Sequence, residues 1–89
     1  MSGSGENERA NRIGREAARL RRQVAAAARA VAATEDQVAE TFEKVAEHRP
    51  GPDATRLRAK AEEARRFAAK ERDLSREYDE SADDYEGRP

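Results

Sequence analysis

Apolar side chains recur at alternating steps of four and three residues along residues 13–45. The repeat passes through Ile13, Ala17, Leu20, Val24, Ala27, Val31, Thr34, Val38 and Val45, and Phe42 adjoins the threonine at position 41. Residues with this spacing lie on one face of an α-helix. A stripe this narrow cannot be shielded from water by its own helix, so the pattern predicts a long helix that packs against another helix.

The strongest interruption of the helical sequence is Pro50-Gly51-Pro52, because neither proline nor glycine supports the interior of a helix. Asp53 is the expected N-cap of the helix that follows. Gly14 is expected to weaken the first helix by about 1 kcal/mol relative to alanine. We therefore expect five segments: a disordered Gly/Ser-rich head (1–7), a helix (8–47), a turn (48–53), a second helix (54–82) and a frayed acidic tail (83–89).

The second helix carries an apolar face of its own, and folding the chain at the turn sets large side chains opposite small ones. Leu74 then faces Ala28, and Ala64 faces Val38, which is how close-packed helix interfaces are filled. The sequence therefore predicts an all-α protein, an antiparallel two-helix hairpin. The predicted seam between the helices comprises Ile13, Ala17, Leu20, Val24, Val31, Val38, Phe42, Val45, Leu57, Ala64, Phe67, Leu74 and Tyr78.

The order of charges along the chain supports the same hairpin. Residues 9–31 carry seven arginines and one glutamate, whereas residues 71–89 carry eight acidic and three basic side chains. An antiparallel hairpin places the basic start of each helix beside the acidic end of the other, whereas a parallel dimer would place arginine beside arginine. The expected neighbours are Arg22 with Glu80, Asp36 with Arg66, and Glu43 with Arg58.

Only 36% of the 89 residues are apolar, so two helices alone bury a thin core. A second copy or another helical protein is the expected partner, and an antiparallel homodimer would form a four-helix assembly. The outer face of the first helix suits such pairing because its basic half precedes its acidic half; a charged helix back that only faces solvent is the open alternative. The predicted interaction surface comprises Arg12, Arg15, Arg19, Arg22, Arg29, Asp36, Glu40, Glu43 and Glu47.

The chain offers little reactive chemistry. It has no cysteine, and its only histidine, His48, stands in the turn. We therefore expect no catalytic residues, no metal site, no cofactor and no small-molecule substrate. No apolar run is long enough to span a membrane, and the first residues lack the features of a signal peptide, so no membrane contact and a cytoplasmic location are expected.

These features predict a non-catalytic helical module for protein–protein interaction or oligomerisation. The alternative is a nucleic-acid-associated helical protein, in which the arginine stripe from Arg12 to Arg29 binds phosphates over about 26 Å. The net charge of −1 and the lack of aromatic residues among those arginines favour the first interpretation.

Overall fold

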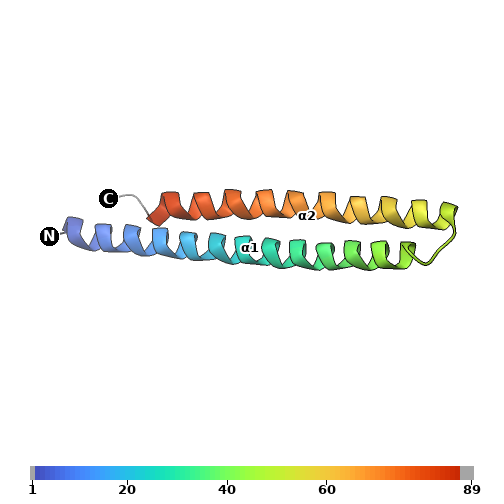
Figure 1. Cartoon of the computed structure of the whole chain (residues 1–89). Helices are drawn as coiled ribbons and strands as arrows, with labels where there is room; N and C mark the ends of the chain where they lie inside the picture. Colours follow the sequence, from blue (N-terminus) through green and yellow to red (C-terminus); the bar gives the residue numbers. More distant parts are fainter. Residues whose placement is uncertain (1, 87–89) are drawn as a thin grey trace.

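Two long helices make up the part of the chain that the structure describes, namely the backbone of residues 2–86 and the side chains of residues 5–86. In this computed structural model, α1 (Ser2–Ala46) and α2 (Gly51–Glu86) lie side by side and run antiparallel (Figure 1). Residues 2–86 contain no strand. The predicted all-α antiparallel hairpin is confirmed.

The helix α1 begins earlier than the sequence predicts. Residues 2–7, expected to be a disordered head, are helical, whereas Met1 lies outside the described residues. Extending an existing helix adds one hydrogen bond for each residue fixed, so the costly step of nucleation is avoided. As a result α1 projects beyond the end of α2 (Figure 1).

The turn between the helices is short, and backbone hydrogen bonds close the end of α1. The N–H of His48 donates to the carbonyl of Val45 at 3.1 Å, and the N–H of Arg49 donates to that of Ala46 at 3.3 Å. These bonds satisfy carbonyls that have no partner further along the helix.

The start of α2 differs from the expected one by three residues. The carbonyl of Pro50 accepts the N–H of Ala54 at 2.9 Å, so the helix begins at Gly51 rather than after Asp53. Pro52 fits in this first turn because an N–H there would have no partner within the helix. Asp53 is therefore not the N-cap, but its negative charge still lies in the first turn, where the helix dipole favours it.

The end of α2 is held by contacts with α1. The helix continues to Glu86, four residues beyond the expected end, and positions 87–89 of the predicted tail lie outside the described residues. The guanidinium of Arg21 lies 4.5 Å from the centre of the Tyr85 ring. Arg22 donates a hydrogen bond of 2.6 Å to Glu86. The last turn of α2 is therefore stabilised by contacts with α1 that the sequence did not predict, and residues 83–86 remain helical.

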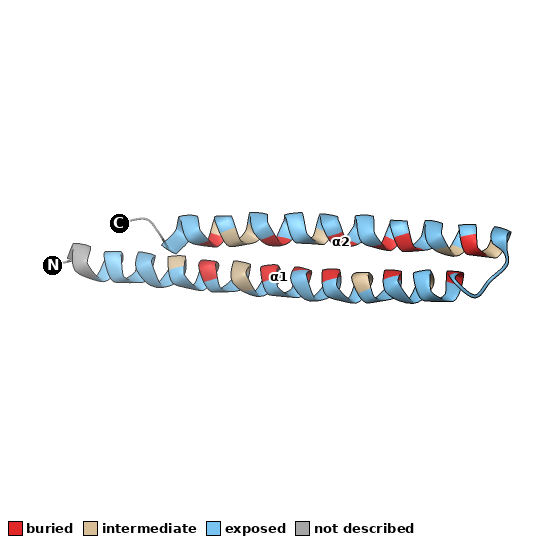
Figure 2. Cartoon of the chain, viewed as in Figure 1, coloured by how far each residue is buried: buried red, intermediate tan, exposed pale blue. Residues whose placement is uncertain are grey.

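In the seam between the helices, the buried residues lie on the facing sides of α1 and α2 (Figure 2), and all but one of them are alanine. The buried residues of α1 are Ala18, Ala25, Ala28, Ala32, Ala39 and Ala46. Those of α2 are Ala54, Ala61, Ala64, Ala68, Ser75 and Ala82. The buried positions of α1 follow the predicted repeat of four and three, but each lies one residue later. Because a methyl side chain lets two helix backbones approach closely, the alanines face the partner helix and fill the seam densely.

This shift of one residue corrects the predicted seam. Four of its members do face the partner helix at least in part: Ala64 is buried, Phe42 packs against the cluster of Ala39, Ala61 and Ala64, and Leu57 and Tyr78 are half-buried. Ala17 is half-buried but lies in the stripe beside the seam, seven residues before Val24. The other eight lie beside the seam and are 37–63% exposed. A step of one residue turns a helix by about 100°, which is enough to move a side chain from the contact to its flank.

Candidate interaction surface

The two sides of the alanine seam have different chemistry. One side carries charged residues from both helices, and we call it the ion-pair flank. It comprises Arg22, Arg29, Asp36 and Glu43 of α1 together with Arg65, Arg72, Asp79, Asp83 and Glu86 of α2.

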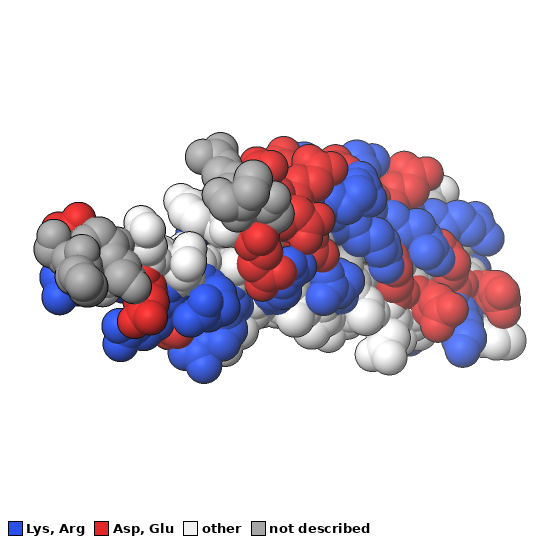
Figure 3. Space-filling model, turned by 90° about the vertical axis from the view of Figure 1, so that its left-hand side faces the viewer, with Lys and Arg blue, Asp and Glu red and all other residues white. Residues whose placement is uncertain are grey.

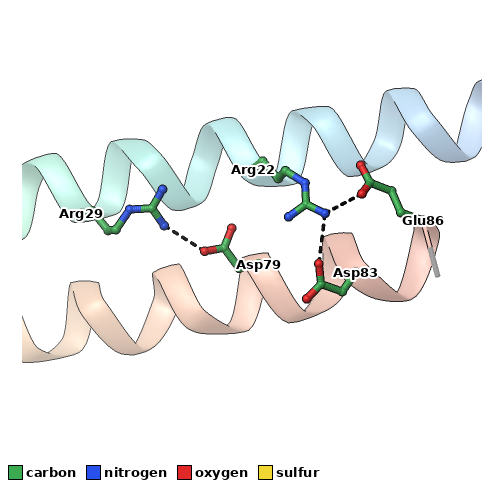
Figure 4. Close-up of polar contacts among 5 residues, drawn as sticks. All are labelled: Arg22, Arg29, Asp79, Asp83 and Glu86. Carbon is green, nitrogen blue, oxygen red and sulfur yellow. Dashed lines mark hydrogen bonds and ion pairs between the residues drawn. The ribbon is translucent and has the colours of Figure 1, made fainter.

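The ion pairs nearest the end of α2 join basic α1 to acidic α2 (Figure 4). Nη2 of Arg22 lies 3.0 Å from Oδ1 of Asp83 and 2.6 Å from Oε2 of Glu86. Nη1 of Arg29 lies 2.9 Å from Oδ2 of Asp79. The hydrogen bonds to Glu86 and Asp83 raise the pKa of Arg22. Like any arginine, Arg22 is positively charged throughout the physiological pH range.

The polarity of the pairs reverses toward the turn, as an antiparallel hairpin requires. Asp36 pairs with Arg72, and Glu43 accepts two hydrogen bonds from Nη2 of Arg65, at 2.8 and 2.9 Å. The hydrogen bond to Glu43 raises the pKa of Arg65. All these side chains are partly open to water, so each pair adds little stability. The single reversal of sign along the flank instead specifies the alignment of the helices.

The observed ion pairs also correct the expected partners. Arg22 contacts Asp83 and Glu86 instead of Glu80. Asp36 contacts Arg72 in place of Arg66, and Glu43 contacts Arg65 in place of Arg58. Each observed partner lies three to seven residues further along α2 than the expected one. The predicted arrangement of basic starts beside acidic ends holds.

The predicted interaction surface on the outer face of α1 is therefore divided. Four of its nine members, Arg22, Arg29, Asp36 and Glu43, contact α2. The remaining five, Arg12, Arg15, Arg19, Glu40 and Glu47, are exposed. Of these, Arg19 pairs with Glu16 one turn away, at 2.6 Å. An antiparallel dimer through this face would compete with the ion pairs that align the hairpin.

The opposite side of the seam is apolar, and we call it the apolar flank. It comprises Ile13, Leu20, Val24, Val31, Val38 and Val45 of α1 with Phe67 and Leu74 of α2, all of them large and exposed. Figure 3, which looks at the end of the hairpin, shows charged side chains over much of the surface, with uncharged ones along the lower edge and at the upper left. Together these eight residues expose on the order of 600 Å² of surface per chain. This sum takes the full accessible surface of each residue as about 150 to 230 Å².

The apolar flank is regular because it follows the seam. Val31 and Val38 each directly precede a buried alanine, and on α2 Phe67 precedes Ala68 while Leu74 precedes Ser75. The sequence contains the signal that separates this flank from the seam, since alanines repeat at the same spacing one position after the valines. Sequence analysis missed these alanines because a hydrophobicity pattern weighs valine above alanine.

Other features of the described residues offer no clear chemistry. His48 is exposed in the turn. A shallow pocket at the end of α2 is lined by residues that include Ile13, Gly14, Asp84 and Tyr85. Within residues 2–86 no cluster of histidine, aspartate and glutamate is suited to hold a metal ion. Neither described helix combines the length and the apolar character needed to cross a membrane.

Comparison with known proteins adds no family to this description. We find no match to this chain among protein-family models, among curated proteins or among solved structures.

Proposed function

We propose that this chain is a non-catalytic helical module for protein–protein interaction and that the apolar flank is its docking surface. The observation that carries the proposal is the exposure of eight large apolar side chains, 37–63% each, along one flank of the seam. Contiguous apolar patches on a typical soluble monomer reach about 300 to 600 Å², and the larger ones mark interaction sites. The apolar flank lies at the top of that range.

The spacing of the apolar flank indicates what kind of partner it fits. Its α1 members follow the repeat of four and three residues from Ile13 to Val45, a length of about 48 Å at 1.5 Å per residue. A straight stripe of this spacing accepts another helix, whose side chains fill the gaps between successive turns. The proposed partner is therefore a helix or a helical pair.

The nucleic-acid alternative is less well supported by the arrangement of charges. Arg22 and Arg29, two of the five residues in the arginine stripe, contact carboxylates of α2. A phosphate would have to displace Asp79, Asp83 and Glu86 or bind beside their negative charge. The remaining arginines span a shorter stretch, and fewer phosphate contacts mean weaker binding.

Site-specific photo-crosslinking in the cells that make the protein tests the proposal. A photoreactive residue replaces Val31 on the apolar flank, and the control replaces Ala33, which is also exposed but not part of the flank. We expect position 31 to crosslink to a protein and position 33 to crosslink much less. Equal yields at the two positions, or products that contain only nucleic acid, would refute the proposal.

A further inference from the structure

We infer that the partner on the apolar flank is a second copy of this chain, with the two α1 helices antiparallel. The inference rests on the proposed function, because it assigns an occupant to the same surface. It replaces the predicted dimer face of charged residues, since Arg22 and Glu43 on that face are engaged within the hairpin.

The helix α1 carries two adjacent stripes of seven-residue repeat. The alanine stripe faces α2, and the stripe from Ile13 to Val45 lies one residue before it, on the flank. Two adjacent apolar stripes are the pattern of a helix that contacts two neighbours, as in four-helix bundles. α2 occupies one stripe, so the other has room for one more helix.

The outer border of the apolar flank is self-complementary in charge. It consists of every seventh residue of α1, namely Glu16, Gln23, Ala30, Gln37 and Lys44. An antiparallel copy of α1 sets Glu16 opposite Lys44, Gln23 opposite Gln37, and Ala30 opposite its own equivalent. In a parallel copy these border residues would lie on opposite sides of the contact, so Glu16 and Lys44 would not meet, and only the antiparallel arrangement pairs their charges.

The same alignment matches the sizes of the apolar side chains. It places Leu20 opposite Val38 of the second copy and Ala27 opposite Val31. Ile13 then meets Val45, so the whole stripe is covered. Sliding one α1 along the other by seven residues in one direction brings Lys44 beside Arg9 of the other copy. Sliding it by seven residues in the other direction separates Lys44 from Glu16. One alignment therefore satisfies both charge and size.

The area also suits a dimer. Each chain exposes on the order of 600 Å² on the apolar flank, so two chains bury up to about 1,200 Å² if the second copy covers all eight residues, which reaches the lower end of the range for specific interfaces. Phe67 and Leu74 of α2 border the same flank, so the second α1 would lie over both helices of the hairpin. The product is a four-helix assembly with the two α1 helices at its centre.

Sedimentation equilibrium of the purified full chain tests the surface. We expect a dimer at about 100 μM, and we expect Val31→Glu to weaken association at least tenfold, because each interface then buries two carboxylates. The matched control is Ala33→Glu, which adds the same charge to an exposed position outside the flank. Circular dichroism establishes that both variants remain helical. A monomeric wild-type chain, or equal weakening by the two variants, would overturn the inference.

Mixing two charge variants tests the alignment. Glu16→Lys and Lys44→Glu should each dimerise several-fold more weakly than the wild-type chain at low salt, because each homodimer faces like charges. An equimolar mixture should recover dimerisation, since every pair in the heterodimer is then of opposite sign. A mixture that associates no better than either variant alone would contradict the antiparallel alignment.

The two proposals fail in different ways. If the purified chain stays monomeric while position 31 crosslinks to a different protein in cells, the homodimer is refuted and the docking function is supported. A monomeric chain whose position 31 crosslinks to no protein overturns both. Crosslinked products made only of this chain, together with a salt-sensitive dimer, support both.

Discussion

Enlarging one alanine of the seam should destabilise the hairpin, and Ala39 is the most informative position. Its side chain has no exposed surface, and it packs with Ala61, Ala64 and the ring of Phe42. Ala39→Leu adds three carbon atoms where no space exists, so the helices must separate locally or the new side chain must leave its preferred rotamer. Adjacent alanines would then lose the close contacts that stabilise the seam.

The expected cost of Ala39→Leu is about 1 to 3 kcal/mol, the usual range for an overpacked core. A chain of this size loses about 4 to 8 °C in Tm for each kcal/mol, so the Tm should fall by about 4 to 24 °C. Ala33→Leu is the matched control because Ala33 is exposed, and it should change stability by less than about 0.5 kcal/mol.

Thermal unfolding followed by circular dichroism at low micromolar concentration measures both variants while limiting the effect of self-association. If the valines filled the seam and the alanines faced water, Ala39→Leu would be tolerated as well as Ala33→Leu. A variant at position 39 that is as stable as the wild-type chain would therefore refute the alanine seam.

Three further predictions follow from particular contacts. Gly14→Ala should raise the free energy of unfolding by about 0.5 to 1 kcal/mol, because alanine favours the helix and the added Cβ would meet only the carbonyl oxygen of Tyr85, at an ordinary 3.6 Å; a lower Tm would contradict it. Glu43→Arg and Arg65→Glu should each lower the Tm and the double variant should restore it in low salt, because Nε and Nη2 of Arg65 donate to the two carboxylate oxygens of Glu43; thermal melts of all four chains decide this. Arg22 is charged at pH 7 and at pH 9, as any arginine is, and its hydrogen bonds to Glu86 and Asp83 raise its pKa further. A base with a raised pKa loses its contribution to stability only as the pH rises through that pKa, so the difference in Tm between the wild-type chain and Arg22→Ala should be the same at pH 7 and pH 9.

Local sequence determines the helices and the hairpin of this protein. The repeat of four and three residues predicts long helices that pack on one another, and Pro50-Gly51-Pro52 places the turn to within a few residues. The order of basic and acidic segments predicts that the helices run antiparallel. These properties depend on spacing, backbone restriction and net charge, all of which can be counted along the chain.

The tertiary structure decides which of two neighbouring stripes becomes the seam. Both the valines and the alanines of α1 have the required spacing, and a hydrophobicity pattern favours the valines because each buries more surface. Contact between two helices depends also on how closely their backbones approach, and only the small side chain of alanine allows the closest packing. The valines therefore remain on the flank, about two-fifths exposed.

The same shift decides the candidate site. Whether Arg22 and Glu43 face solvent or α2 depends on the rotation of each helix about its axis, which differs by about 100° for a shift of one residue. A pattern along one helix determines which residues share a face. The direction in which that face points is decided by the fit of two surfaces, because the energy of packing belongs to the pair of helices and not to either one alone.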